Sequence, residues 1–171
     1  MQPDHDQIPE QALAWHRAGE GAALATVIET WGSAPRPVGS QLAVSGAGRM
    51  AGSVSGGCVE GAVVEEAMAA LKDGRSRLLT FGVSDEDAFA VGLACGGTIR
   101  VMVEPVGGSL AVGDLEAITE ARARRRPLAV LTNLESWAKR LSPPTEALAV
   151  STARELGGPV VLKIASPDIA H

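Results

Sequence analysis

The sequence predicts an α/β or α+β fold in which a mixed β-sheet is flanked by helices. Short segments rich in Val, Ile, Leu and Ala alternate along the chain with segments whose apolar residues follow the helical period. Glycine and proline residues separate these segments. A length of 171 residues allows one domain with a hydrophobic core, so we expect residues 1–171 to form a single domain.

In the first half of the chain, glycine and proline residues mark the ends of the predicted elements. The spacing of the apolar residues indicates whether each element is a helix or a strand. Pro9 lies where a helix begins and Gly19 where it ends. Two prolines flank Arg36 and place it in a loop. After Gly57 the spacing of the apolar residues changes from the period of a strand to that of a helix. The predicted elements are a helix at 9–18, a strand at 22–30, a loop at 34–39, a hairpin of 41–45 and 49–54, and a helix at 59–74.

The second half of the chain continues the alternation. Ser84 and the acidic run after it are typical of a helix cap, and Pro127 stops a helix that ends in the arginines at 122–126. We expect these arginines to be solvated, because cations are favoured at the negative pole of a helix. The predicted elements are a strand at 77–83, a short helical segment before Gly92, a strand at 98–104, a helix from 115, a strand at 128–132, a helix at 146–156 and a strand at 159–164.

The composition argues against several kinds of surface. The formal net charge is -5 and aromatic residues make up 3%, which disfavours a general nucleic-acid surface or one for anionic membranes. The sequence contains no run of about 18 uncharged apolar residues and does not begin like a signal peptide. We therefore expect a cytoplasmic protein with no nucleic-acid or membrane partner.

Both cysteines of the chain lie beside glycine residues, and this pattern indicates a functional site. Cys58 follows the segment 55–57 and Cys95 precedes the segment 96–97, and these are the two cysteines of the chain. Glycine beside cysteine lets backbone N–H groups and a ligand approach the sulfur closely. A free cysteine near a helix start is also commonly a small buried hydrophobic residue. The occurrence of both cysteines in glycine-rich loops favours ligand binding or thiol chemistry over that structural role.

The position of Cys58 has an electrostatic consequence. It lies at the predicted start of the helix at 59–74. Unpaired N–H groups and the helix dipole favour negative charge at such an end, so we expect the loop to stabilise a thiolate or to hold an anionic ligand. Glu60 opposes this expectation, because a carboxylate in the first turn complements the dipole and repels a second anion.

Positive charge and hydroxyl groups precede Cys58 in the sequence. Residues 30–59 include two arginines and no acidic residue. Arg36, constrained by its prolines, is suited to binding phosphate or another planar oxyanion, and Ser33 and Ser55 add hydroxyl donors. Arg49 is explained equally well as an ordinary charge of the hairpin.

Common catalytic motifs are absent from the sequence. The glycine segment before Cys58 is neither a P-loop nor a dinucleotide-binding turn, and there is no Gly-x-Ser-x-Gly elbow. The three histidines lie toward the termini, so the cysteines do not make a closed zinc site. The acidic run at 85–87 is typical of a solvated helix start. No general acid or base stands out, so no catalytic residue is assigned, and binding is favoured over turnover.

Three segments, at residues 29–39, 52–60 and 92–97, resemble in the same order the N-terminal domain of the XdhC/CoxI family. Members of this family are accessory proteins of molybdenum hydroxylases such as xanthine dehydrogenase and carbon monoxide dehydrogenase. The resemblance covers roughly residues 12–105. Many relatives carry a C-terminal Rossmann-like domain that this sequence does not contain, so we expect a single-domain member or a second half on another chain.

The resemblance implies a chaperone that binds the molybdenum cofactor (molybdopterin), protects it while its sulfido ligand is installed, and delivers it to an apo-hydroxylase. It also implies a cysteine desulfurase as a second partner, and a homodimer. Cys58 corresponds to the cysteine of the family motif, which makes it the candidate for contact with the metal or its sulfur. The candidate cofactor-binding residues are Ser33, Arg36, Ser55, Gly56, Gly57, Cys58, Cys95, Gly96 and Gly97.

The residues alone leave alternatives open. Backbone donors at a helix start, a constrained arginine and a soft sulfur ligand match the phosphate and the metal of the cofactor. The same cysteines also suit a thiol-dependent sulfurtransferase, or a dithiol redox enzyme that uses Cys58 and Cys95. A third possibility is a protein-interaction module in which the glycine loops are only tight turns.

Overall fold

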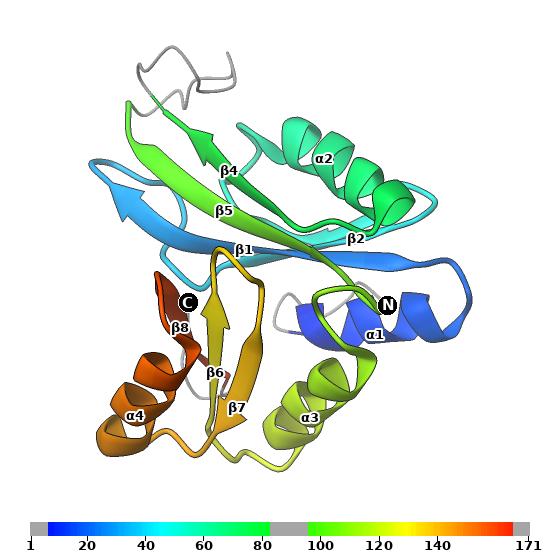
Figure 1. Ribbon diagram of the computed structural model, residues 1–171. Helices are drawn as coiled ribbons and strands as arrows, with labels where there is room; N and C mark the ends of the chain where they lie inside the picture. The colour runs from blue at the N-terminus through cyan, green and yellow to red at the C-terminus, as the bar shows by residue number, and fades with distance from the viewer. Residues whose placement is uncertain (1–6, 83–95, 166–171) are drawn as a thin grey trace.

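Two antiparallel β-sheets and four helices make up the described part of the chain (Figure 1). The structure is a computed structural model that describes residues 7–82 and 96–165, with the backbone alone for 146–149. Within these ranges no helix is both long enough and apolar enough to cross a bilayer. The first sheet has the strand order β3-β2-β1-β5-β4 and the second has the order β7-β6-β8. The strands are β1 (Ala22–Trp31), β2 (Gln41–Ser45), β3 (Met50–Gly52), β4 (Arg77–Phe81), β5 (Thr98–Pro105), β6 (Leu128–Asn133), β7 (Lys139–Ser142) and β8 (Val160–Ala165), and the helices are α1 (Ile8–Arg17), α2 (Glu60–Asp73), α3 (Val112–Ala123) and α4 (Glu146–Leu156).

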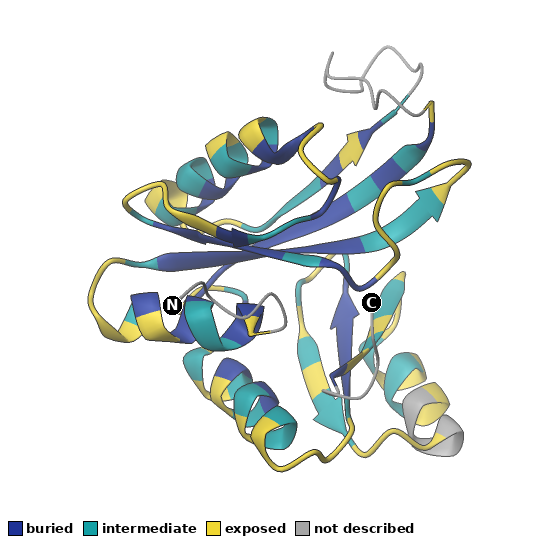
Figure 2. Ribbon diagram, turned by 180° about the vertical axis from the view of Figure 1, so that it is seen from behind, coloured by how far each residue is buried: buried dark blue, intermediate teal, exposed yellow. Residues whose placement is uncertain are grey.

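The central strand β1 is buried on both faces, which explains its continuous apolar sequence (Figure 2). Ala23, Ala25 and Val27 belong to the core cluster that includes α2. Ala22 and Leu24, which alternate with them, belong to the cluster that includes α1. Because successive side chains of a strand point to opposite faces, β1 separates two apolar layers.

Helix α2 covers one face of the five-stranded sheet. Val63, Ala67 and Ala70 are fully buried and lie three or four residues apart, as an amphipathic helix requires. Gly74 ends the helix in the left-handed region, with φ of 72°, and its N–H donates to the Ala70 carbonyl at 2.8 Å. The predicted helix and its glycine stop are confirmed.

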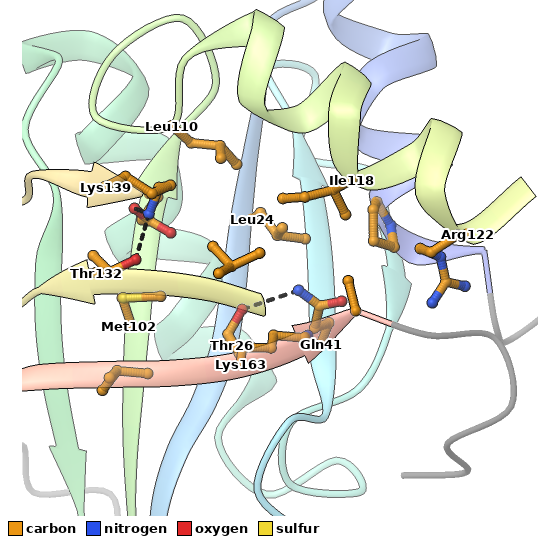
Figure 3. A pocket seen from close by; sticks show the side chains of 15 residues that line it. Leu24, Thr26, Gln41, Met102, Leu110, Ile118, Arg122, Thr132, Lys139 and Lys163 are labelled. Atoms are coloured by element: carbon orange, nitrogen blue, oxygen red, sulfur yellow. Dashed lines mark hydrogen bonds and ion pairs between the residues drawn. The ribbon is translucent and has the colours of Figure 1, made fainter. Parts of the chain in front are cut away.

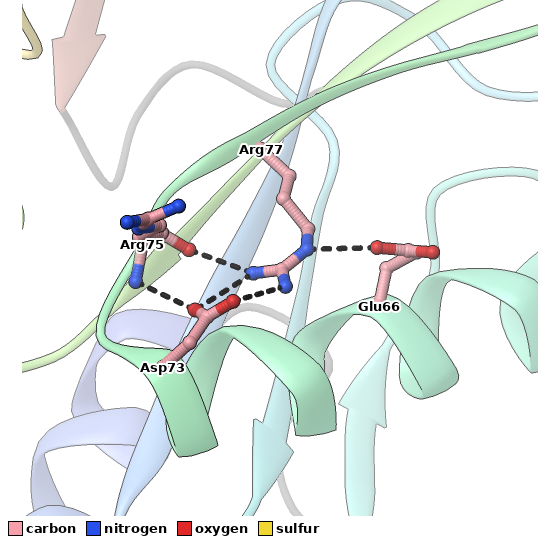
Figure 4. A network of polar contacts seen from close by, with 4 residues as sticks. All are labelled: Glu66, Asp73, Arg75 and Arg77. Atoms are coloured by element: carbon pink, nitrogen blue, oxygen red, sulfur yellow. Dashed lines mark hydrogen bonds and ion pairs between the residues drawn. The ribbon is translucent and has the colours of Figure 1, made fainter.

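An arginine ties the end of α2 to the start of β4 (Figure 4). Arg77 lies 2.8 Å from Glu66 and 2.8 Å from Asp73, and it donates to the Arg75 carbonyl at 2.8 Å. The Arg77 guanidinium and the Arg75 N–H lower the pKa of Asp73. These contacts fix the turn by which the chain leaves α2 and enters the edge strand of the sheet.

The other face of the five-stranded sheet is covered by α1 and by the second sheet (Figure 1). Ala12, Leu13 and Trp15 of α1 pack on Leu24. Ile118 of α3 packs against β6 and β8. Helix α4 contacts all three strands of the second sheet.

The α/β class is confirmed, but the pairing of the strands differs from the single mixed sheet that the sequence predicts. All pairs between named strands are antiparallel within the described residues. The reason is the path of α2, which carries the chain from β3 at one edge of the sheet to β4 at the opposite edge. The expected short helix after Ser84 lies outside the described residues, and strand β7 was not predicted.

Candidate functional site

The glycine segments meet at one end of the five-stranded sheet. Strand β1 pairs antiparallel with β5, and Trp31 at the end of β1 is opposite Thr98 at the start of β5. A Cβ atom built on Gly97 would lie 2.6 Å from the carbonyl oxygen of Ser33 and 3.0 Å from that of Trp31. Glycine at position 97 therefore permits a close backbone contact between the segments.

The loop before α2 reaches the same place. A Cβ atom built on Gly56 would lie 3.8 Å from Cβ of Pro35, the residue before Arg36. We call the surface formed by residues 32–36, 53–59 and 96–97 the motif edge. All three segments of the family resemblance contribute to it.

A β-bulge in β1 leads the chain into the motif edge. The register of β1 against β5 shifts between Val27 and Glu29. The Val27 N–H donates to the Ser40 carbonyl at 2.9 Å, and its carbonyl accepts from the Gly39 N–H at 2.8 Å. Beyond the bulge, Arg100 of β5 donates to the Glu29 carboxylate at 2.5 Å. Sequence reasoning missed this ion pair because the two residues meet only through the strand register.

Glu60, the first residue of α2, lies at the centre of the loop at 53–59. One carboxylate oxygen, Oε1, accepts from the Ser53 hydroxyl at 2.6 Å and from the backbone N–H groups of Val54 at 3.1 Å and Ser55 at 2.9 Å. The other, Oε2, accepts from the Gly57 N–H at 2.8 Å and from the Ser55 hydroxyl. The residue is 7% exposed. The loop is thus folded around a buried carboxylate.

The hydrogen bonds keep Glu60 ionised. Burial is the largest single influence on its pKa and opposes ionisation, but the hydroxyls of Ser53 and Ser55 and the Ser55 N–H together outweigh it and lower the pKa from 4.5 to about 2. Glu60 therefore holds a negative charge beneath the loop at neutral pH.

Five backbone donors of the loop are used within the loop. The Gly56 N–H donates to the Ser53 hydroxyl at 2.8 Å, and the Val59 N–H donates to the Ser55 hydroxyl at 2.9 Å. Together with the bonds to Glu60, these contacts satisfy the N–H groups of residues 54–57 and 59. The sequence predicts that donors at Gly56 and Gly57 face a ligand or the thiolate, but in the structure they face the chain's own carboxylate and hydroxyl groups.

Cys58 is exposed at the surface of this loop. The residues on either side of it are anchored, since the Gly57 N–H binds Glu60 and the Val59 side chain is 1% exposed in the core. The interpretation of Cys58 as a small buried residue is therefore wrong. Cys58 is therefore accessible to a ligand at the motif edge.

The loop at 32–36 contributes positive charge. Arg36 is exposed, and no hydrogen bond or ion pair joins it to the part of the chain that the structure describes. Ser33 is also exposed. Arg49, the other arginine of this stretch, instead pairs with Glu20 and lies 5.2 Å from the ring centroid of Trp15. Arg49 is therefore an ordinary charge of the hairpin and Arg36 is the arginine of the motif edge.

The second glycine segment is described only in part. Cys95 lies outside the described residues. Gly96 is exposed and Gly97 is buried. Among the described residues, no group of three or more His, Cys, Asp and Glu side chains could hold a metal ion. Cys58 therefore offers a single soft ligand, which suits a metal that brings its other ligands with it.

A cavity of about 50 Å³ lies between the two sheets (Figure 3). Lys139 of β7 lies 2.8 Å from Glu104 of β5, with side chains 3% and 4% exposed, and it also donates to Thr132 at 2.6 Å. Lys163 of β8 donates to the Gly39 carbonyl at 3.1 Å. This volume is enough for a few water molecules. Sequence reasoning missed the cavity because its charged groups come from three separate strands and from helix α3.

Two basic residues of this cavity differ from ordinary surface charges. Burial lowers the pKa of Lys163 to about 7; the Arg122 charge adds to this effect and the Glu104 charge opposes it. Arg122 was expected to be solvated at a helix end. Its side chain is instead 13% exposed and lies 2.8 Å from Glu10, so it joins α3 to α1.

Two of the sequence segments that form the motif edge match a known protein family. The model of the XdhC and CoxI family matches residues 15–82, which include the loop that carries Arg36 and the loop that carries Cys58. Residues 15–82 belong to the XdhC and CoxI family.

Relatives share this XdhC/CoxI region. The Escherichia coli (strain K12) protein PaoD, named a molybdenum cofactor insertion chaperone, is 35% identical over 125 residues, which are 73% of this chain and 38% of PaoD. A Bacillus subtilis (strain 168) protein, named as part of a probable xanthine dehydrogenase, is 35% identical over 89 residues, which are 51% of this chain and 27% of that protein. The chain thus spans less than half of either relative.

A solved structure shares the fold of this chain. A crystal structure described as a xanthine dehydrogenase from Bacillus halodurans matches it with a TM-score of 0.70 and 20% identity. The match covers 98% of this chain and 53% of that chain. It therefore includes the second sheet as well as the sheet that carries the motif edge.

Proposed function

We propose that this chain is an accessory chaperone that binds the molybdenum cofactor at the motif edge and delivers it to a molybdenum hydroxylase of the xanthine dehydrogenase or carbon monoxide dehydrogenase type. The observation that carries the proposal is that the family's glycine segments converge and present the exposed Cys58 beside the loop of Arg36. The naming of PaoD as a molybdenum cofactor insertion chaperone supports the same role.

The two side chains suit different parts of the cofactor. The Cys58 thiol is a soft ligand for molybdenum or its sulfur. The Arg36 guanidinium matches the phosphate of the pterin, and the Ser33 hydroxyl lies in the same exposed loop. Gly56, Gly57 and Ser55 shape the loop, since their hydrogen bonds are made within it. Gly97 allows Ser33 to approach, and Gly96 precedes it at the proposed site. Cys95 is included in the proposal from its place in the sequence alone.

The proposal includes partners that handle the cofactor before and after this chain. A cysteine desulfurase supplies sulfur for the sulfido ligand, and the apo-hydroxylase receives the finished cofactor, in the cytoplasm. Trp31 and Val38 are each 49% exposed and flank the 32–36 loop, so apolar surface is available beside the cargo for a partner protein. We also propose that the chain acts as a homodimer.

A retention assay tests the binding role. Purified protein is incubated with molybdenum cofactor without oxygen, separated from free cofactor, and oxidised so that the retained pterin becomes fluorescent. Wild type should retain pterin, and Cys58→Ala and Arg36→Ala should retain about tenfold less, the equivalent of one lost strong contact. Arg154→Ala is the matched control, because Arg154 is also exposed but lies on α4. Absence of pterin from wild type and variants alike would contradict the proposal.

Exposure of Cys58 also favours a second candidate, a thiol-dependent sulfurtransferase. In that case sulfur would be carried as a persulfide on Cys58. Incubation with thiosulfate, whose outer sulfur the Cys58 thiolate would take up with release of sulfite, followed by mass spectrometry of the peptide that contains Cys58, distinguishes the two functions. A persulfide that forms and is transferred to an acceptor thiol, with no pterin retained, favours the enzyme. A disulfide between Cys58 and Cys95 would instead favour the dithiol redox alternative.

A further inference from the structure

We propose that the cavity between the two sheets is a binding site for a small monovalent oxyanion, which the ammonium group of Lys163 holds. The residues that line this cavity include none of the motif edge. The site is therefore separate from the cofactor role proposed above and does not depend on it.

The charged side chains that line the cavity are mostly basic. Among the described residues, one acid, Glu104, and three bases line it, namely Arg122, Lys139 and Lys163. Glu104 pairs with Lys139 at 2.8 Å, and Arg122 lies 2.8 Å from Glu10 on α1. No ion pair joins Lys163 to a carboxylate in the part of the chain that the structure describes. Lys163 is thus the lining cation for which the described residues supply no counter-charge.

The ammonium group of Lys163 has donors available to a ligand. It carries three N–H groups, and the acceptor that the described residues give it is the Gly39 carbonyl, at 3.1 Å. Thr26 of β1 lines the same cavity (Figure 3). Its hydroxyl accepts from the Gln41 side chain at 3.1 Å and keeps its own proton to donate. An oxyanion in the cavity has acceptor oxygens for these donors.

The walls of the cavity set the size and the charge of the ligand. The volume of about 50 Å³ holds a few water-sized groups, so the ligand has roughly three or four heavy atoms. Much of the wall is apolar, with Leu24, Met102 and Val130 among its residues. Apolar walls do not solvate a buried charge, so a single cation is best neutralised by a single negative charge. Formate has this size and charge.

The protonation of Lys163 is linked to the binding of an anion. Burial lowers the pKa of Lys163 to about 7, the Arg122 charge adds to this effect, and the Glu104 charge opposes it. Lys139 of β7 also lines the cavity, whereas β1, β2 and β6 contribute the uncharged side chains of Thr26, Gln41 and Thr132. An anion that binds the protonated amine raises the pKa of this amine. The anion in turn binds more weakly as the pH rises above 7.

Formate tests the site by its effect on thermal unfolding. Sodium formate replaces sodium gluconate at constant ionic strength and pH 6, since gluconate has the same charge but is too large for the cavity. The midpoint of wild type should rise with formate and reach a plateau, because the ligand binds the folded chain. In Lys163→Met this rise should be lost. Lys72→Met, which removes an exposed lysine, is the matched control and should respond as wild type does. Equal responses of Lys163→Met and wild type would overturn the inference.

Nuclear magnetic resonance of the lysine side chains measures the linkage directly. The Lys163 signal is assigned by its absence from Lys163→Met and is followed against pH in gluconate and in formate. With formate at ten times its dissociation constant, the pKa of Lys163 should be about one unit higher than in gluconate. The apparent dissociation constant of formate should be about tenfold larger at pH 8 than at pH 6, as a pKa of about 7 requires. The same pKa in both salts would contradict the proposed site.

A second variant covers the case in which Lys163→Met does not fold. Val130→Ile leaves Lys163 in place and adds one carbon to the wall, so it takes up part of the cavity. Formate should bind this variant about tenfold more weakly, because the ligand and the added carbon compete for the same space. Its Lys163 pKa in gluconate should stay close to that of wild type. Wild-type affinity for formate in Val130→Ile would show that the anion binds outside the cavity, and the inference would fail.

Discussion

The Glu60 carboxylate lies 2.8 Å from the backbone nitrogen of Gly57 and accepts its N–H. This bond closes the loop at 53–59 onto the first residue of α2, with Cys58 between its two ends. A glycine-rich loop before a helix often serves as an anion site. In this chain the carboxylate occupies that site, and the loop presents a thiol instead.

Glu60 makes the stability of the protein depend on pH in the acid range. Its pKa falls from 4.5 to about 2 on folding, so the unfolded chain binds its proton first as the pH is lowered. The stabilisation is therefore complete above pH 4.5 and is lost toward pH 2. Urea unfolding of wild type and Glu60→Gln should show a stability difference at pH 7 that shrinks by about 3 kcal/mol toward pH 2. A difference that stays constant over this range would contradict the assignment.

Gly97 should tolerate no side chain. Alanine at this position would place a Cβ atom 2.6 Å from the Ser33 carbonyl oxygen, and both contacts are with backbone that cannot move without disturbing β1. We expect Gly97→Ala to lower the free energy of unfolding by about 1–3 kcal/mol. In Gly113→Ala the new Cβ atom meets nothing within 4 Å in helix α3, so this control should be neutral or slightly stabilising. Equal effects in the two variants would refute the close contact at the motif edge.

The buried pair of Lys139 and Glu104 should be costly to break. Glu104→Gln would leave the Lys139 ammonium buried without its counter-charge, and we expect a loss of about 3–5 kcal/mol in urea unfolding. The ion pair of Arg124 and Glu120 is the control, since both side chains are more than half exposed. Glu120→Gln should cost no more than about 0.5 kcal/mol. A small loss in Glu104→Gln would show that water reaches the cavity between the sheets.

Lys163 should make stability rise with pH above neutrality. Its pKa is about 7 in the folded chain and 10.5 ordinarily, so between these values the unfolded chain binds more protons than the folded one. Wild type should therefore gain about 2 kcal/mol relative to Lys163→Met between pH 7 and pH 9. Lys72→Met, which removes an exposed lysine, should show no such change. Parallel pH profiles for wild type and Lys163→Met would contradict the burial of this amine.

Local signals predicted most of the elements. The apolar run of β1 and the glycine after α2 gave correct positions because each depends on neighbouring residues in the sequence. Strand β7 was missed, since its four residues include Lys139 and Arg140 and are held by pairing with β6. The mixed sheet was wrong because the course of α2 between opposite edges depends on the whole sheet.

The candidate site could be predicted only in part. Cys58 and Arg36 were proposed as site residues because of the glycine and proline beside them, which are local features. Glu60 was interpreted as an obstacle to anion binding, and that interpretation stays a prediction. In the structure five donors bind the Glu60 carboxylate. The sequence could not predict this, because the fold of the loop decides which donors the carboxylate reaches.

The most direct test of the account is the ligand content of the protein isolated without oxygen from cells that make molybdenum cofactor. Molybdenum is measured by mass spectrometry and pterin by fluorescence after oxidation. The account predicts both in equal amounts in wild type and loss of both in Cys58→Ala. A folded wild-type protein that carries neither molybdenum nor pterin, under conditions in which the cell's hydroxylase is loaded, would contradict it.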